Sequence, residues 1–196
     1  MTTTPLPDHN LPEQPARRGL LGGAALALAG LLLRPGAALA ATANAAYVNI
    51  VEFAGNGRRL RVVKLPPVVK PDETWRAQLS PLAYQVTRHE GTERAFSGKY
   101  AESNDKGIYH CICCDTALFS SATKFDSGTG WPSFWQPIAK ENIIQREDHS
   151  YFMVRTTVSC RRCAAHLGHV FDDGPEPTGL RYCMNSVALR LAPLTA

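Results

Sequence analysis

The first apolar stretches bounded by turn-forming residues lie at 47–64. Two apolar-rich segments there flank Ala54-Gly55-Asn56-Gly57. Strand-like segments separated by glycine and asparagine predict a β-hairpin. Pro66, Pro67 and Pro71 follow it closely and favour a short, stiff linker.

Two helices are expected after this linker. Asp72 is placed to cap a helix that carries Trp75 and Leu79 on one face. Ser80-Pro81 predicts the start of a second helix, because proline is favoured at the first helical position. Gly91 marks the expected end of that helix.

Beyond Gly107 the pattern changes to short β-like stretches separated by glycine and proline clusters. Residues 151–158 alternate in part, and Val187, Leu189 and Leu191 alternate with smaller or polar residues. The sequence therefore predicts a mainly β, α+β fold of small antiparallel sheets with helices on its N-terminal side.

Residues 1–40 have the composition of an export signal. A polar, proline-rich stretch leads to Arg17-Arg18, an apolar run at 20–33 and the small-residue sequence Ala38-Leu39-Ala40. The paired arginines indicate the twin-arginine route. We expect a periplasmic protein with no stable membrane insertion once the leader is removed near Ala40. The alternative is an uncleaved leader that tethers the chain to the membrane.

Bulk composition favours one globular domain and argues against nucleic-acid binding. The chain has 196 residues, 44% of them hydrophobic, which is enough for a domain with its own core. The formal charge is +4, and no block of Lys or Arg exceeds two residues. The sequence therefore lacks the clustered positive charge of a nucleic-acid binder. We also expect the chain to be a monomer.

Four of the six cysteines form two C-x-x-C pairs, Cys111 with Cys114 and Cys160 with Cys163. This spacing is typical of a closed tetrahedral zinc site. Each pair lies near a predicted strand end, where a tight turn can present both sulfurs to one ion. One structural zinc per chain is predicted, with two disulfides as the alternative.

Cys183 stands apart from both pairs, between Arg181 and Asn185, and His166 and His169 precede it. A nearby imidazolium lowers a thiol pKa and stabilises the nucleophilic thiolate. A second imidazole could donate a proton to an oxygen that leaves sulfur. Arg181 and Asn185 add donors that could hold the site in position. The alternative is that both histidines are ordinary turn residues.

Aromatic side chains occupy the turn-like sequence from Gly128 to Trp135, which is rich in glycine and proline residues. Such side chains often pack over a core as a lid. The alternative is an apolar wall for a methyl or thioether group, and Trp131 and Phe134 would then contact the substrate.

In order along the chain, these motifs resemble methionine sulfoxide reductase B, the family that acts on the R epimer at sulfur. The resemblance rests on G-T-E-R-A-F-S-G from Gly91, Y-H-C-I-C-C-D-T from Tyr109, K-F-D-S-G-T-G-W-P-S-F from Lys124, C-R-R-C-A-A-H-L-G-H-V-F-D-D-G-P-E-P-T-G from Cys160 and R-Y-C-M-N-S from Arg181. It runs from about Asp72 to Leu191 and leaves residues 41–70 outside, as an N-terminal extension.

The resemblance implies a catalytic domain at 71–194, with two small antiparallel sheets in a β-tent-like arrangement stapled by zinc. It implies Cys183 as the nucleophile and Trp131 facing the substrate methyl. His166, His169 and Asn185 would be polar partners of Cys183, and Arg181 would support the site.

The resemblance also implies the reaction. Attack on the sulfoxide sulfur would turn Cys183 into a sulfenic acid. A second thiol would then condense with it, and a thioredoxin-like donor would reduce the disulfide. Oxidised periplasmic proteins are the expected substrates.

The chain departs from many family members at Thr129, where they place a resolving cysteine. Cys113, between the zinc ligands Cys111 and Cys114, is the unassigned thiol and is predicted to be the resolving residue. The alternative is a buried, inert Cys113 and direct reduction of the Cys183 sulfenic acid by a partner.

Two non-enzymatic classes compete with this interpretation. A zinc-ribbon binding module explains the four paired cysteines. It gives no role to Cys183, to the two histidines or to the sequence from Gly128 to Trp135, called the tryptophan turn below. A disulfide-stabilised secreted binding domain is the other class, and one bound zinc per chain would exclude it.

Overall fold

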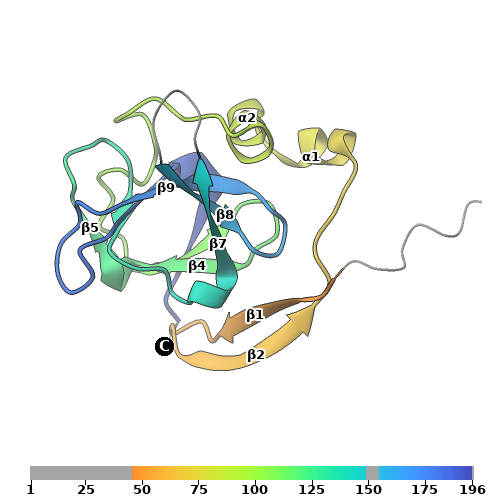
Figure 1. The fold of residues 1–196 in the computed structure, drawn as a ribbon, viewed down its shortest axis with the longest axis horizontal. Helices are drawn as coiled ribbons and strands as arrows, with labels where there is room; N and C mark the ends of the chain where they lie inside the picture. Colours follow the sequence, from red (N-terminus) through yellow and green to blue (C-terminus); the bar gives the residue numbers. More distant parts are fainter. Residues whose placement is uncertain (1–45, 149–154, 196) are drawn as a thin grey trace, which may run out of the picture. The chain divides into compact units, whose positions relative to one another are not determined.

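A computed structural model of the chain describes residues 46–148 and 155–195. The leader predicted at 1–40 lies outside the described residues, as do positions 151–154 of the predicted strand pattern. The described ranges contain two α-helices and three antiparallel sheets (Figure 1). No helix in these ranges has the length and apolar character needed to cross a membrane.

The hairpin predicted at 47–64 is confirmed. Strands β1 (Val48–Phe53) and β2 (Arg59–Leu65) pair antiparallel. The Asn142 side chain completes the outer edge of β1, since its Oδ1 accepts from the Val51 N–H at 2.7 Å. Its Nδ2 donates to the Val51 carbonyl at 3.0 Å and to the Ala117 carbonyl at 2.8 Å. One buried amide thus ties the hairpin to the rest of the fold as a neighbouring strand would.

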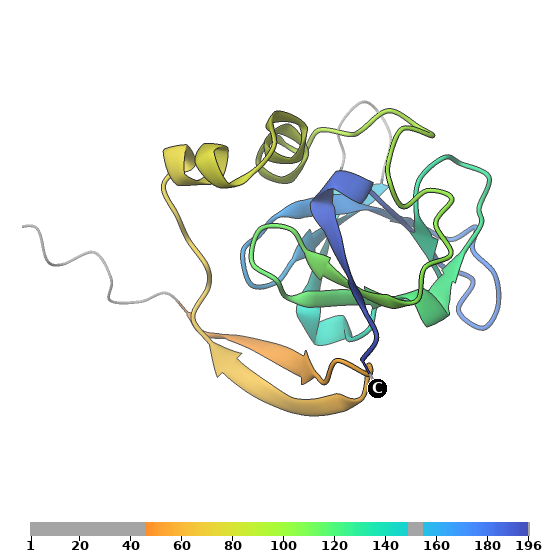
Figure 2. The ribbon, with the colours of Figure 1, turned by 180° about the vertical axis from the view of Figure 1, so that it is seen from behind.

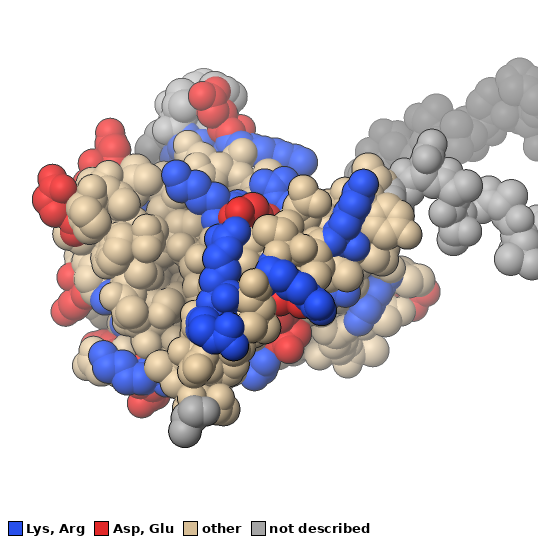
Figure 3. Space-filling model, turned by 90° about the horizontal axis from the view of Figure 1, so that it is seen from below, with Lys and Arg blue, Asp and Glu red and all other residues tan. Residues whose placement is uncertain are grey.

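The hairpin turn also meets the C-terminal end of the fold. The Thr195 N–H donates to the Gly55 carbonyl at 3.1 Å, where the last strand runs toward the hairpin (Figure 2). On the face that carries the hairpin, Lys and Arg side chains lie with Asp and Glu among them (Figure 3). Part of this positive charge is paired, because Arg59 bonds Glu141 and Arg61 bonds Glu52, both at 2.9 Å.

We expect Asn142→Ala to lower the free energy of unfolding by roughly 1–3 kcal/mol, because it leaves buried backbone groups of Val51 and Ala117 without their partners. Denaturant unfolding of the variant measures this loss. Asn104→Ala, on an exposed loop, is the matched control and should unfold like the parent chain. Equal stability of both variants would contradict the role given to Asn142.

Both predicted helices are present as α1 (Asp72–Gln78) and α2 (Pro81–His89). Ser80 caps α2, since its hydroxyl accepts from the Ala83 N–H at 3.2 Å. The helix ends before Gly91, whose N–H donates to the Gln85 carbonyl at 3.1 Å. The start signal at Ser80-Pro81 and the end signal at Gly91 are therefore confirmed.

The predicted cap at Asp72 is wrong. Pro71 occupies the cap position of α1 without a side-chain cap, and Asp72 is already the first helical residue. Its carboxylate instead accepts hydrogen bonds from the Tyr84 hydroxyl and from Arg76 Nε. These contacts hold the pKa of Asp72 below its usual value, with the Tyr84 bond as the first cause. Asp72 therefore links α1 to α2 rather than starting α1.

The strands beyond Gly107 form two antiparallel sheets, as predicted, although one is larger than expected. The six-stranded sheet has the spatial order β5 (Lys124–Phe125), β6 (Ser133–Phe134), β10 (Arg181–Met184), β9 (His166–Phe171), β8 (Arg155–Cys160) and β7 (Ile143–Asp148). The three-stranded sheet has the order β11 (Leu189–Pro193), β3 (Gly107–Cys111) and β4 (Ala117–Ser120). Val187 was expected to continue the last strand, but it lies in a 3₁₀ turn at Ser186–Ala188. The β-tent designation stays a prediction.

Candidate functional site

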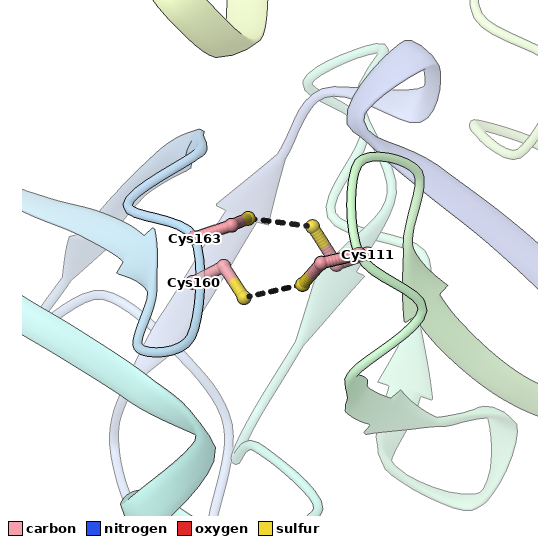
Figure 4. Close-up of side chains that lie close together, drawn as sticks. Cys111, Cys160 and Cys163 are labelled. Atoms are coloured by element: carbon pink, nitrogen blue, oxygen red, sulfur yellow. Dashed lines mark hydrogen bonds between the residues drawn. The ribbon is translucent and has the colours of Figure 1, made fainter. Parts of the chain in front are cut away.

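The two C-x-x-C pairs meet in one cluster (Figure 4). Their four sulfurs all lie within 4.8 Å of one another. Cys111 Sγ is 3.6 Å from Cys163 Sγ, and Cys114 Sγ is 3.5 Å from Cys160 Sγ. A tetrahedral zinc with bonds of about 2.3 Å to sulfur requires sulfur–sulfur separations of roughly 3.8 Å, whereas a disulfide requires about 2.05 Å. The four thiols therefore fit one zinc ion and do not match two disulfides.

The two C-x-x-C pairs lie in turns, called knuckles below, that are built in the same way at the end of a strand. Cys111 ends β3 and Cys160 ends β8. Four residues after each first cysteine the backbone turns left-handed, at Asp115 with φ 63° and at Ala164 with φ 55°. Both turn residues donate their N–H to the carbonyl of that first cysteine, at 2.9 Å in each case. The prediction that tight turns at strand ends present the sulfurs is confirmed.

Cys113 belongs to this neighbourhood and not to the surroundings of Cys183. Cys113 is 4% exposed and belongs to the same buried core cluster as Cys111 and Cys163. A disulfide with Cys183 would require Cys113 to leave this buried position. Its resolving role stays a prediction, and the placement of Cys113 does not favour it.

Cys183 lies in the middle of the six-stranded sheet, on β10. Its neighbours across the ladder are Ser133 on β6 and His169 on β9. Paired residues project from the same face, so Ser133, Cys183 and His169 form a row. Thr129 Oγ1 lies 4.0 Å from Cys183 Sγ. Strands β9 and β10 approach closely here, since a methyl group at Gly168 would lie 2.1 Å from the Cys183 carbonyl oxygen.

A register irregularity brings the two histidines together. Residues three apart in a regular strand project from opposite faces. Pairing of β8 with β9 shifts between Val158 and Ser159, and the rings of His166 and His169 lie 5.3 Å apart at 67°. His166 is buried at 3% exposure and His169 is half-buried. The structure thus places His169 opposite Cys183 with the His166 ring against it.

The expected lowering of the Cys183 pKa is not found. Burial raises the pKa of this thiol and is the largest influence on it. Opposing influences that lower the pKa are the hydrogen bond with Thr129, the charge of Arg181 and a hydrogen bond with Ser133. Desolvation penalises the thiolate more than these groups stabilise it, and the pKa of the thiol therefore lies above its ordinary value.

Arg181 lies on the same face of β10 as Cys183 and is fixed by Asp173. Its Nε and Nη2 donate to the two carboxylate oxygens of Asp173 at 2.8 and 2.7 Å. This pairing lowers the pKa of Asp173 and raises that of Arg181. The guanidinium also stacks over the Phe171 ring, 4.4 Å from its centroid. A bidentate partner and a stacked ring together orient the cation that faces the thiol.

Asn185 positions backbone around the site. Its Oδ1 accepts from the Glu93 N–H at 2.9 Å, and its Nδ2 donates to the Leu167 carbonyl at 3.0 Å. Both ends of its amide are therefore engaged in joining β9 to the loop after α2. This arrangement agrees with a positioning role.

Trp131 and Phe134 were both predicted to contact the substrate, and the structure separates them. Trp131 is half-buried, and its indole N–H donates to the Glu93 carbonyl at 3.1 Å. Phe134 is fully buried, pairs with Tyr182 and stacks on Phe119 at 4.6 Å. Strand alternation places Ser133 on the face of Cys183 and Phe134 on the opposite one. The contact predicted for Phe134 stays a prediction, and its position in the core does not favour it.

Comparison with known proteins identifies the family. The SelR domain model matches residues 79–193, more than half of the chain. The peptide methionine sulfoxide reductase MsrB of Pseudomonas entomophila is 61% identical over 121 residues, which cover 62% of this chain and 92% of that protein. The proteins of the same name from Hahella chejuensis and Thioalkalivibrio sulfidiphilus are 56% and 60% identical over 63% and 60% of this chain, and over 88% and 86% of their own lengths.

The chain belongs to the methionine sulfoxide reductase B family. Membership indicates an oxidoreductase that acts on methionine sulfoxide. The SelR match begins at residue 79, so the hairpin, the linker and all of α1 precede it. The side chain of Asn142 therefore joins the reductase domain to a segment that the family model does not include.

Sequence reasoning missed two residues that support this candidate site, Asp173 and Glu93. Glu93 is 2% exposed, and its carboxylate accepts from the Ser186 and Val187 N–H groups at 2.6 and 3.0 Å. Through its backbone it also holds Asn185 and Trp131. Both acids lie inside the motifs that carry the resemblance, and a charged residue next to Gly91-Thr92 was the available signal for Glu93.

Proposed function

We propose that this chain reduces the R epimer of methionine sulfoxide in oxidised proteins, through a sulfenic acid on Cys183. The observation that carries the proposal is the row of Ser133, Cys183 and His169 on one face of the six-stranded sheet. A partly accessible thiol lies opposite His169, beside Thr129 and on the same face as Arg181. Trp131 supplies an aromatic side chain for the substrate methyl group, from the turn that also carries Thr129.

The reaction moves one oxygen atom from the substrate to the enzyme. The Cys183 sulfur, deprotonated as the substrate binds, forms a bond to the electrophilic sulfoxide sulfur while the oxygen takes up a proton. The hydroxyl then passes to the Cys183 sulfur, as its bond to the substrate sulfur and the bond between the two sulfurs both break, and the thioether leaves. A thiol and a sulfoxide thus become a sulfenic acid and a thioether, and cysteine is oxidised as methionine is reduced.

We assign the proton donor to His169, because this imidazole lies opposite Cys183 in the ladder. A positioned imidazole is a suitable general acid near neutral pH. Arg181, held by Asp173, supplies fixed positive charge that favours the thiolate as it forms. His166 packs against His169 and orients its ring.

We further propose that an external thiol of the thioredoxin class reduces Cys183 directly. Thr129 is the residue beside the nucleophile, and a hydroxyl cannot form a disulfide. The first donor thiol condenses with the sulfenic acid, releases water and forms a mixed disulfide. A second donor thiol then restores Cys183 and leaves with the donor disulfide. Burial of Cys113 in the thiol cluster supports this route over an internal disulfide.

Cys111, Cys114, Cys160 and Cys163 would hold a structural zinc. Four thiolates fill a tetrahedral shell, so the ion would join two strand ends without contacting the substrate. The export pattern at 1–40 supports a periplasmic location, where oxidised secreted proteins are the substrates.

A stereospecific assay tests the proposed function. We expect the purified chain, with dithiothreitol as reductant, to convert methionine (R)-sulfoxide to methionine and to leave the S epimer essentially unchanged. The Cys183 thiol, the His169 imidazole and the Trp131 side chain have fixed positions around the substrate. Only one configuration at the substrate sulfur therefore directs the sulfoxide oxygen toward His169. Separation of the products by chromatography provides the measurement. Equal rates on the two epimers would contradict the proposal.

A further inference from the structure

Phe96 is an exposed aromatic residue held in an unfavourable backbone conformation near the candidate site. It lies in the loop between α2 and β3, and 66% of its surface is exposed. Its φ of 62° is in the left-handed region. Bulky residues rarely adopt this region, and they keep it only where surrounding contacts impose it.

Two hydrogen bonds impose that conformation by joining the loop to the tryptophan turn. The Phe96 N–H donates to the Gly130 carbonyl at 2.8 Å. In the opposite direction, the Trp131 indole N–H donates to the Glu93 carbonyl at 3.1 Å. Glu93 is itself anchored by its buried carboxylate, so the base of this loop is fixed.

The Phe96 ring lies directly against Gly130. A methyl group at Gly130 would approach Phe96 Cδ2 to 2.7 Å. Gly130 stands between Thr129, whose hydroxyl is 4.0 Å from the Cys183 sulfur, and Trp131. The ring therefore borders the turn that carries both of these residues, and most of its surface remains in water.

Folding alone gives no reason for this arrangement. An exposed ring contributes little to the hydrophobic core, and a left-handed backbone opposes it. A residue with these two properties, against the turn that carries Thr129 and Trp131, is better explained by contact with a substrate. Aromatic side chains provide a large contact area at a small cost in side-chain entropy.

We propose that Phe96 contacts the polypeptide around the oxidised methionine and is a residue through which the chain favours the protein-bound substrate over free methionine sulfoxide. This inference rests on the proposed function of Cys183. The sulfoxide group occupies the space between Cys183 and Trp131, and the residues that flank it reach outward to Phe96. Free methionine sulfoxide has no such residues and leaves Phe96 in water.

Steady-state kinetics of Phe96→Ala on two substrates tests the inference. One substrate is free methionine (R)-sulfoxide, and the other is a short peptide with one internal methionine (R)-sulfoxide. We expect kcat/KM for the peptide to fall roughly tenfold, mainly through KM, because apolar contact with the flanking residues is lost. For the free amino acid we expect a change below about twofold. Phe96→Tyr keeps the ring and should keep the parent ratio of the two rates.

Two further variants separate substrate contact from loop structure. Phe96→Gly lacks the ring but favours the left-handed backbone, and it should match Phe96→Ala in the ratio of the two rates. Leu82→Ala removes another exposed apolar side chain, 47% exposed on α2, and should behave as the parent. An equal loss on both substrates, or no loss on either, would overturn the inference. A parent chain that reduces neither substrate would overturn the proposed function and the inference with it.

Discussion

Replacement of Cys183 by Ser is expected to lower sulfoxide reduction by roughly a thousandfold or more, because a serine hydroxyl is far less nucleophilic than a thiol at neutral pH. Serine is close in size to cysteine, so the six-stranded sheet should keep its register with His169 and Ser133. The measurement is the rate on methionine (R)-sulfoxide with dithiothreitol. Unchanged zinc content and thermal unfolding would confirm that the variant is folded. Activity near that of the parent would refute Cys183 as the nucleophile.

Cys160→Ser should remove the metal and most of the stability of the fold. Cys160 is fully buried at the end of β8, and its sulfur faces Cys114. Structural zinc contributes on the order of 10 kcal/mol of apparent binding free energy, and loss of one thiolate forfeits much of it. We expect less than one zinc per chain by elemental analysis, and a cooperative unfolding transition that is strongly lowered or absent.

Cys113→Ser is the control for this loss, because Cys113 lies in the facing turn, between Cys111 and Cys114, but outside the group of four sulfurs. It should retain one zinc per chain and unfold close to the parent temperature. A Cys160→Ser chain that unfolds like the parent would show that the cluster does not stabilise the fold. A Cys113→Ser chain without zinc would show that the ligand set is wrong.

The sequence predicted those features that depend on neighbouring residues. The hairpin, the start of α2 at Ser80-Pro81 and the two C-x-x-C turns follow from proline, glycine and cysteine spacing. The cap at Asp72 failed although it was local. Tyr84 and Arg76 compete for its carboxylate, and neither contact is visible before the two helices are placed together.

Strand register and long-range contacts could not be predicted in the same way. Ser133 and Phe134 are adjacent in one motif, yet only the pairing of β6 with β10 decides that Phe134 enters the core. The role of Glu93 depends on partners more than ninety positions away, at Ser186 and Val187. The raised pKa of Cys183 follows from burial, which no spacing of charged residues reveals.

Single-turnover trapping tests the central claim most directly. The chain is mixed with one equivalent of methionine (R)-sulfoxide without reductant, treated with a 1,3-dione that captures sulfenic acids, and digested for mass spectrometry. We predict an adduct on Cys183 in amount equal to the methionine formed, with Cys113 unmodified and no disulfide between the two. Methionine formed without an adduct or a disulfide at Cys183 would contradict the claim that this thiol receives the substrate oxygen.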